Sequence, residues 1–426
     1  MKYFIHKLTI GLFVVLSISF CGCDEVNKLI EKAKQLIPDS GYQYNAEDER
    51  EWAQGTSNKM RPNAPKGVNA PNKVPKGCYY SFSWNAPNAT QCCVNWSFFN
   101  KNGEKKEGTS NWIDKLEHTW RVPNEEGVMY VNVYAKNLGG QSQEPLAFEV
   151  KVIGKVDDKG IEILSNDDYL SIFSNSSAYN NKFAYWCAKA SRDAYESNPY
   201  DAMSFLGFKN HKEIDRPALK LKAFVSSRKI ENPINKTIVI ISIRGTKKIT
   251  NWLEDVVAYP IGWENELQIL PDFFNTTPVA HGGFYLCTNA IWEKIKTYPD
   301  YSKNALFIVT GHSLGGAIAE LLSLKLKDAG IPAQNIICYG FASPPVGNEK
   351  LKKYANDKGL GLRIYKIMNT MDPVPELGIY AFTLADKNNV KTFTAMGEQL
   401  GHKMESVYLN HILETLEKVY CVEAKR

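Results

Sequence analysis

The stretch VTGHSLGG at residues 309–316 decides the fold, because one side of it reads as a strand and the other as a helix. The apolar run ALFIVTG at 305–311 predicts a buried strand, and LGGAIAELLSLKLKDAG at 314–330 predicts a helix. Ser313 stands between two glycines, which permit a tight strand-to-helix turn that presents a serine hydroxyl. The stretch therefore predicts a nucleophile elbow on an α/β sheet.

The same alternation of strand and helix patterns extends on both sides of the elbow. Residues 236–246, 335–344 and 362–369 read as further buried strands, and 183–196 reads as a helix. Strands interleaved with helices predict a mostly parallel sheet flanked by helices. We expect this α/β unit to occupy residues 160–426, as one part of a multidomain chain.

Residues 62–154 have a different pattern, with short runs of aromatic and β-branched residues separated by turn residues. Such runs at regular spacing predict an all-β sandwich. Two of them, YYSFSWNAP at 79–87 and YVNVYAKNLGGQS at 130–142, resemble strands of fibronectin type III domains. The resemblance implies a fibronectin type III-like domain in this part of the chain.

The N-terminus reads as an export signal followed by a tether. A short basic region precedes the apolar run LTIGLFVVLSISF at 8–20, which is too short to span a bilayer comfortably. A glycine before Cys23 resembles the cleavage site of a bacterial lipoprotein signal. We expect residues 1–22 to be a signal peptide, Cys23 to carry lipid, and 23–61 to be a tether. The protein would then be exported and membrane-anchored, in the periplasm or at the cell surface of a bacterium. A plain secretory signal or an anchor helix is the alternative.

Composition limits the other functional classes. A formal net charge of +5 over 426 residues, not gathered in one block, gives little reason to expect a nucleic-acid partner. The nine cysteines include no C-x-x-C pair, and no His/Cys cluster predicts a metal site. Cys78 is expected either to form a disulfide with Cys92 or Cys93, or to remain with them as free buried thiols.

A serine nucleophile needs a base, and on this fold the base follows the serine in the chain. Only His402 and His411 follow Ser313. The pattern of residues 403–420 predicts a helix whose apolar stripe lies nearly opposite His411, which would then face solvent. His402 lies in the loop before that helix, so we favour it as the base and keep His411 as the alternative.

The base needs an acid to orient it, and Asp372 is the favoured acid. It directly follows the predicted strand at 362–369, and functional groups gather beyond the carboxyl ends of parallel strands. The other acidic residues weighed after the elbow are Asp328, Asp357, Asp386, Glu376 and Glu398.

An oxyanion formed at Ser313 needs hydrogen-bond donors. The amide of Leu314 would lie at a helix N-terminus. The run RGT ends at Thr246, just after a predicted strand, and offers a second amide with a hydroxyl beside it. The amphipathic run ITNWLEDVVAY at 249–259 carries Trp252 and predicts either a core helix or a lid.

Taken in chain order, these motifs resemble the class 3, or fungal-type, lipase family of α/β-hydrolases. The resemblance covers about 160–426 and is carried by the motifs IRGTKKITNWLED, VAHGGF, VTGHSLGGAIAELL, YGFASPPVGN and NTMDPVPEL. The family usually has an aromatic about two residues after its last histidine, and HKMESVYL at 402–409 departs from this by about one extra residue.

The resemblance implies roles for the residues that match the family's motifs. Ser313 would be the nucleophile and Asp372 the acid. Thr246 and Leu314 would form the oxyanion hole. Trp252 would lie on a mobile lid. His281 would be structural, near the site but not the base.

The expected activity is hydrolysis of carboxylic esters through an acyl-enzyme, as in a triacylglycerol lipase or esterase, with no cofactor and no metal. The partners would be an ester or lipid substrate and, through the lipid anchor, a membrane. Within the enzyme class, a phospholipase or a feruloyl-type esterase is the alternative. Outside it, the alternative is an inactive, surface-anchored binding or adhesion lipoprotein that uses the fibronectin-like domain.

Overall fold

The computed structural model describes the chain from residue 61 to residue 419 with five gaps. The described ranges are 61–174, 179–231, 235–246, 259–264, 276–377 and 382–419. The predicted signal peptide and tether, with Cys23, lie outside these ranges, and so does Trp252. Among the described helices, none combines the length and the apolar character needed to cross a membrane.

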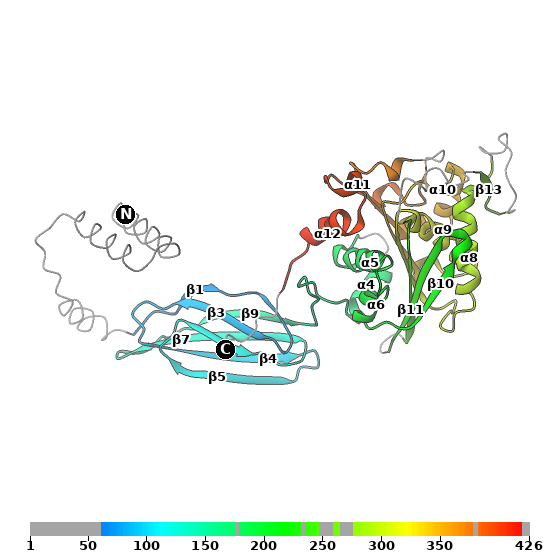
Figure 1. The fold of residues 1–426 in the computed structure, drawn as a ribbon. Coiled ribbons are helices and arrows are strands. Elements are labelled where there is room, and N and C mark those ends of the chain that lie inside the picture. The colour runs from blue at the N-terminus through cyan, green and yellow to red at the C-terminus, as the bar shows by residue number, and fades with distance from the viewer. Residues whose placement is uncertain are drawn as a thin grey trace, which may run out of the picture.

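The N-terminal described part consists of two β-sheets, coloured blue to cyan in Figure 1. One has the strand order β1-β3-β6 and the other the order β2-β9-β7-β4-β5, with β8 paired to β7. The strands are β1 (Lys66–Asn69), β2 (Lys73–Pro75), β3 (Tyr79–Asn85), β4 (Gln91–Asn100), β5 (Lys105–Ile113), β6 (Glu117–Arg121), β7 (Gly127–Asn137), β8 (Gly140–Gln141) and β9 (Leu146–Ile153).

Alternation of side chains between the two faces of each strand builds the core between these sheets. In β7, Val131 and Val133 are fully buried, and they belong to the same apolar cluster as Phe82 and Trp84 of β3. This is the all-β sandwich that the short, regularly spaced runs predict.

The structure corrects one expectation in this part. Cys78 is disulfide-bonded, but Cys92 and Cys93 are free and buried, so neither is its partner. Neighbouring residues of a strand point to opposite faces. Cys92 therefore lies in the apolar core, while Cys93 contacts Thr109 of the adjacent strand.

The larger part of the chain is built on a mixed sheet of seven strands with the order β10-β11-β12-β15-β16-β17-β18. The five strands from β12 to β18 are parallel, and β10 and β11 are antiparallel to their neighbours. The strands are β10 (Lys209–Arg216), β11 (Leu221–Ile230), β12 (Lys236–Ile243), β15 (Leu306–His312), β16 (Ile336–Phe341), β17 (Ile364–Asn369) and β18 (Val390–Phe393); β13 (Pro260–Gly262) and β14 (Val279–His281) form a separate pair.

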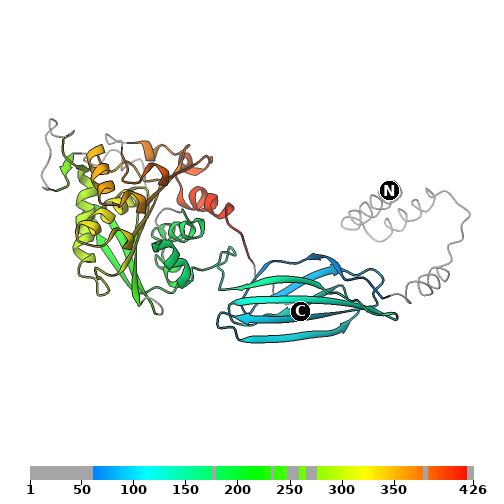
Figure 2. The ribbon, with the colours of Figure 1, turned by 180° about the vertical axis from the view of Figure 1, so that it is seen from behind.

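Helices cover both faces of this sheet, as Figures 1 and 2 show from opposite sides. The apolar cluster on one face includes residues of α4 (Asn166–Ser174), α5 (Asn181–Asp193), α6 (Asp201–Phe205) and α12 (Asn410–Glu414). The cluster on the other face includes residues of α8 (Gly282–Ile295), α9 (Leu314–Asp328) and α10 (Glu349–Asp357). α11 (Glu398–Gly401) is a short helix beyond β18.

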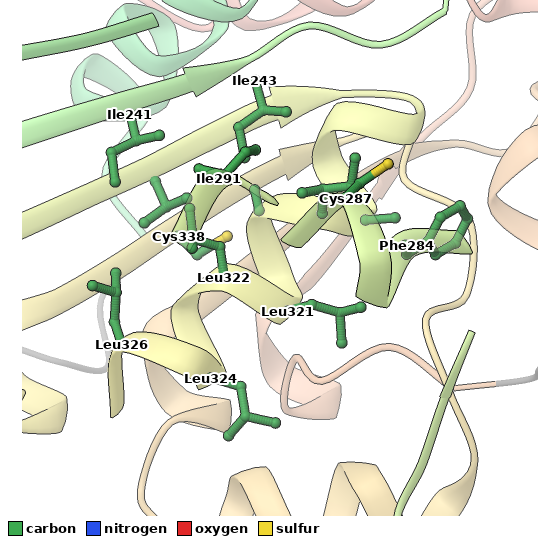
Figure 3. Packing of buried hydrophobic residues seen from close by; sticks show 14 of the residues in the cluster. Ile241, Ile243, Phe284, Cys287, Ile291, Leu321, Leu322, Leu324, Leu326 and Cys338 are labelled. Carbon is green, nitrogen blue, oxygen red and sulfur yellow. The ribbon is translucent and has the colours of Figure 1, made fainter. Parts of the chain in front are cut away.

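The central strands are apolar along their whole length because both faces are covered. Ile241 and Ile243 of β12 belong to one buried apolar cluster with Leu321 and Leu322 of α9, part of which Figure 3 shows. The strands and helices expected around VTGHSLGG are therefore present, with ends that differ from the predicted ones by a few residues.

The C-terminal helix differs from its prediction. A π-helical segment, Met404–Leu409, precedes α12, and α12 ends at Glu414. A π-helical segment has more residues per turn than an α-helix, so residues after it are rotated from the positions that an α-helical pattern predicts. His411 is half-buried and stacks on Phe393 with ring centroids 3.9 Å apart. The expectation that it faces solvent is wrong.

The first turn of α9 approaches β12 very closely at Gly315. A Cβ added there would lie 2.1 Å from the carbonyl oxygen of Ile243. Only glycine fits this contact, which fixes the helix against the strand that leads to Thr246.

We predict that Gly315→Ala destabilises the protein by about 3 kcal/mol, because overpacking at a rigid backbone contact cannot be relieved by a side-chain movement. Urea unfolding followed by circular dichroism measures the loss. Gly154→Ala is the control, because the nearest atom to its Cβ would be the far end of the flexible Glu126 side chain, at 3.2 Å, and the Ile163 side chain would be at an ordinary contact distance of 3.7 Å. Equal stability of the two variants would contradict the close packing described for α9.

Candidate active site

Ser313 occupies the turn between β15 and α9. Its backbone has φ 59° and ψ −129°, a conformation that is strained for a residue other than glycine. The amide of Ser313 donates to the carbonyl of Phe341 at 2.8 Å, and its side chain makes no cap hydrogen bond to α9. The serine hydroxyl is thus held on a sharp turn and is not used to cap the helix.

Asp372 and His402 are brought together by the loops that follow β17 and β18. The Nδ1 atom of His402 donates to Oδ2 of Asp372 at 2.7 Å, and both side chains are almost fully buried. A carboxylate acceptor at Nδ1 assigns the hydrogen to that nitrogen and leaves Nε2 as a proton acceptor. In the described part of the chain, Nε2 of His402 is buried and has no hydrogen-bond partner.

Two further donors hold the carboxylate of Asp372. The hydroxyl of Tyr408 donates to Oδ2 at 2.7 Å, and the amide of Val374 donates to Oδ1 at 3.0 Å. The Tyr408 hydroxyl also accepts from the amide of Asn369 at 3.0 Å. Tyr408 therefore ties the acid to the end of β17.

The other acidic candidates serve other contacts. Asp328 accepts from Nε1 of Trp263 at 2.7 Å and from Lys358 at 2.7 Å, at the far end of α9. Asp386 accepts from the amide of Asn388 at the start of a helical turn. Asp357 and Glu398 form surface ion pairs with Lys353 and Lys403. Glu376 lies in a short helical turn.

His312 links the elbow to His402. Its Nε2 lies 2.8 Å from the carbonyl oxygen of His402, and its Nδ1 lies 3.0 Å from the hydroxyl of Tyr195. Burial, followed by the nearby His402, lowers the pKa of His312 well below its usual value, so the ring is neutral. Burial raises the pKa of Tyr195, so its hydroxyl keeps its proton and donates to Nδ1. His312 then carries its hydrogen on Nε2 and donates to the His402 carbonyl.

Tyr195 also contacts the loop after β12. Its hydroxyl packs against the backbone of Gly245, since a Cβ added to Gly245 would lie 2.3 Å from that hydroxyl. The same Cβ would lie 3.1 Å from Cβ of Ser313. Thr246, the next residue, is half-buried, and Leu314 on the other side of the serine is the first residue of α9. Gly245 and Leu314, which belong to two different segments, thus lie next to Ser313.

Three residues of this site were missed by the sequence analysis. Tyr195 and His312 received no role. Tyr195 is 117 residues from His312 in the chain, so their contact has no local signal in the sequence. Tyr408 lies within the quoted run HKMESVYL but also received no role. His281, in contrast, has the structural position that the resemblance implies, since its ring caps α8 and stacks on Phe284 at 3.9 Å. Trp252 lies outside the described residues, so its place on a lid stays a prediction.

Comparisons with known proteins match part of the chain to lipases. The family model for lipase (class 3) matches residues 240–381, which is less than half of the chain. Secreted mono- and diacylglycerol lipase A of Penicillium cyclopium is 31% identical over 149 residues, covering 33% of this chain and 42% of that protein. A lipase of Rhizomucor miehei is 31% identical over 157 residues, covering 34% of this chain and 39% of that protein. The chain thus spans about two fifths of the length of these curated relatives.

Solved structures match each part of the chain separately. The triacylglyceride lipase of Rhizomucor miehei aligns with 49% of this chain and 78% of that one, at 23% identity and a TM-score of 0.36. The FN5 domain of Drosophila Lar aligns with 22% of this chain and 99% of that one, at 21% identity and a TM-score of 0.18.

The buried His281 predicts a pH dependence of stability. Burial lowers the pKa of His281 from 6.5 to about 4, so between these values the unfolded chain binds a proton that the folded chain does not. Stability is therefore full above about pH 6.5 and falls as the pH drops toward 4, by about 3 kcal/mol in total from this residue.

His281→Asn keeps an N-cap acceptor and removes the titration. Between pH 7 and pH 4, we expect the unfolding free energy of the wild type to fall more than that of the variant. Urea unfolding at each pH measures both values. A difference that is constant over this range would show that His281 is not held neutral by burial.

Proposed function

We propose that this protein is a serine hydrolase that cleaves carboxylic esters through an acyl-enzyme, with Ser313 as nucleophile, His402 as base and Asp372 as acid. The observation that carries the proposal is the buried Asp372–His402 hydrogen bond, which leaves Nε2 of His402 without a partner among the described residues, beside the strained elbow. The match of residues 240–381 to the class 3 lipase model supports the same chemistry.

The proposed mechanism follows from the protonation states of these groups. Nε2 of His402 takes the proton from the Ser313 hydroxyl as the serine oxygen attacks the ester carbonyl. Asp372 stabilises the imidazolium that forms, because its carboxylate already accepts from Nδ1. The imidazolium then gives the proton to the leaving alcohol, and the same steps with water as nucleophile release the acid and regenerate the serine.

The oxyanion that forms at the carbonyl needs donors in a fixed position. We assign this role to the amides of Leu314 and Thr246, with the Thr246 hydroxyl in support. The close contact of Gly315 with Ile243 holds the two segments together. Tyr195 acts as a positioning residue, because it joins the Gly245 backbone to His312 and, through it, to His402.

A lipid ester is the favoured substrate class. The relatives include mono- and diacylglycerol lipases and a chloroplastic phospholipase A(1) of Arabidopsis thaliana, which is 28% identical over 171 residues. We therefore propose acylglycerols first and phospholipids as the alternative. A feruloyl-type esterase and an inactive, surface-anchored binding protein are the remaining readings.

We also propose the organisation expected from the sequence. Residues 1–22 form a lipoprotein signal, 23–61 a tether from a lipid-bearing Cys23, 62–154 a fibronectin type III-like spacer, and 160–426 the hydrolase. The names of the secreted relatives support export. The bacterial lipid anchor rests on the sequence around Cys23 alone.

Removing a triad member is expected to abolish ester hydrolysis. Ser313→Ala and His402→Ala should each lower kcat for p-nitrophenyl acetate by about 10⁴-fold or more. His411→Ala is the matched control, because His411 stacks on Phe393 and should leave kcat within about threefold of the wild type. Full activity of Ser313→Ala, or loss in His411→Ala but not in His402→Ala, is incompatible with this triad.

Tyr195→Phe tests the positioning role. Loss of one buried hydrogen bond to a group that acts through the base should lower kcat about tenfold with KM within about twofold. Tyr185→Phe is the control, since it removes a buried hydroxyl whose partner, at 2.6 Å, is Asp157. If both variants lose stability equally and neither loses kcat, Tyr195 has only a structural role.

A further inference from the structure

Cys78 forms a disulfide, and its partner is none of the other cysteines in the described part of the chain. Those cysteines are all free and buried, and they are Cys92, Cys93, Cys187, Cys287 and Cys338. The sequence has nine cysteines, so the candidates that remain within this chain are Cys21, Cys23 and Cys421, which lie outside the described residues. The segment that comes closest to Cys78 therefore identifies the partner.

The N-terminal segment meets the sandwich at the end of β7. Arg61, the first described residue, lies beside Gly140, because a Cβ added to that glycine would be 3.2 Å from the Arg61 side chain. Gly140 pairs with Asn137, the last residue of β7. The chain that follows the predicted signal peptide and tether thus reaches the sandwich at this end.

Cys78 lies at the opposite end of the sandwich. The backbone amide of Lys76 donates to the carbonyl of Ile153 at 2.9 Å, just where β9 ends. The neighbouring Val152 pairs with Gly127, the first residue of β7. The 11 residues of β7 extend over about 33 Å at ~3.3 Å per residue. The entry point of the N-terminal segment is therefore remote from Cys78.

The C-terminal segment, in contrast, returns to the end of the sandwich that carries Cys78. After α12, Glu417 forms an ion pair with Lys73 of β2. The amide of Val419 donates to the carbonyl of Gly160 at 2.8 Å, and Gly160 belongs to the connection between β9 and α4. Figures 1 and 2 both show the chain after α12 running to the sandwich beside this connection.

We propose that Cys78 and Cys421 form a disulfide that fastens the C-terminal segment of the α/β part to the β-sandwich. Cys421 is two residues beyond Val419, and an extended chain of that length spans about 7 Å. β2 ends at Pro75, three residues before Cys78. The segment that carries Cys421 thus arrives at the strand that leads to Cys78.

This bond gives the sandwich a second connection to the α/β part. The first is the backbone between β9 and α4, which is fixed to α5 at Asp157. The carboxylate of Asp157 accepts from the buried Lys189 at 2.8 Å and from the hydroxyl of Tyr185 at 2.6 Å. A single linker normally permits rotation between two domains, whereas two connections at one end of the sandwich restrict it. The disulfide thus holds the two parts in one orientation.

Formation of the bond requires an oxidant of the disulfide class. Each thiol loses one proton, the two sulfurs together lose two electrons, and the S–S bond forms. The disulfide of the oxidant, a protein disulfide oxidase or oxidised glutathione, breaks and takes up these electrons and protons as two thiols. Such oxidants act in export compartments. The proposed export signal would also remove Cys21 and leave Cys23 to carry lipid, so neither would compete for Cys78.

Peptide mapping of the full chain tests the pairing. The folded chain is treated with oxidised glutathione, unfolded in urea with N-ethylmaleimide, and digested with trypsin and chymotrypsin, which separate Cys78 from the next cysteines by cleavage after Tyr80. We expect one linked pair of peptides, with Cys78 joined to Cys421, and maleimide on the five described free cysteines. A link from Cys78 to Cys21 or Cys23, a link to a second copy of the chain, or maleimide on Cys78 would overturn the proposal.

A double-mutant cycle measures the effect of the bond on stability. Cys78→Ser and Cys421→Ser should each lower the Tm by about 5 °C, and the double variant should lower it no further, because each change removes the same bond. Cys287→Ser is the control, since it removes a free thiol. Dithiothreitol should lower the Tm of the wild type and of this control by a similar amount and leave that of Cys421→Ser unchanged. Additive losses in the double variant, or an equal effect of dithiothreitol on Cys421→Ser, contradict the bond.

Discussion

The hydrogen bond between Asp372 and His402 is the interaction on which the rest of the site depends. It joins two loops that are 30 residues apart and that follow neighbouring parallel strands. The carboxylate is buried, so its oxygens need hydrogen-bond donors in place of water, and three donors are present. Tyr408 and the amide of Val374 supply two of them. Because the imidazole supplies the third from Nδ1, its other nitrogen faces the interior as an acceptor.

A second constraint is the geometry of the elbow. Ser313 is held in a strained conformation by contacts on both sides, with the Phe341 carbonyl at its amide and α9 directly after it. Gly315 lets the helix touch the β12 strand, and Gly245 lets the next loop touch Tyr195. The strain is thus maintained by backbone contacts that no larger residue would permit. The strand–helix elbow positions Ser313, and the loops after β17 and β18 carry Asp372 and His402.

Local patterns predicted the parts of this structure that depend on local sequence. The strand before Ser313, the helix after it and the position of Asp372 beyond a strand all follow from hydrophobic periodicity and turn residues. His402 was favoured over His411 for two reasons. Its position in a loop before the last helix agrees with the structure, but the expectation that His411 faces solvent is wrong, since a π-helical segment precedes His411 and its ring stacks on Phe393. Such a segment has no clear signature in a pattern of apolar residues.

Local sequence patterns could not predict the contacts between segments that are distant in the chain. The approach of Tyr195 to His312 depends on where α5 ends relative to the sheet, which no spacing in the sequence encodes. Of the two states considered for the cysteines of the sandwich, a bond from Cys78 to Cys92 or Cys93 is wrong and free buried thiols are correct for Cys92 and Cys93; the sequence left both open because the direction of each cysteine depends on strand register. Asn369 reads as an ordinary turn residue, and its role as an anchor for two loops is visible only in the folded chain.

The central claim is that Ser313 is an activated nucleophile. The most direct measurement is peptide mapping by mass spectrometry after the folded full chain reacts with a fluorophosphonate, which phosphonylates serines whose base takes the hydroxyl proton. The account predicts one adduct, on the peptide that contains Ser313, and none after the protein is unfolded before the reaction. A folded protein that remains unmodified, or that carries the adduct on another residue, would contradict it.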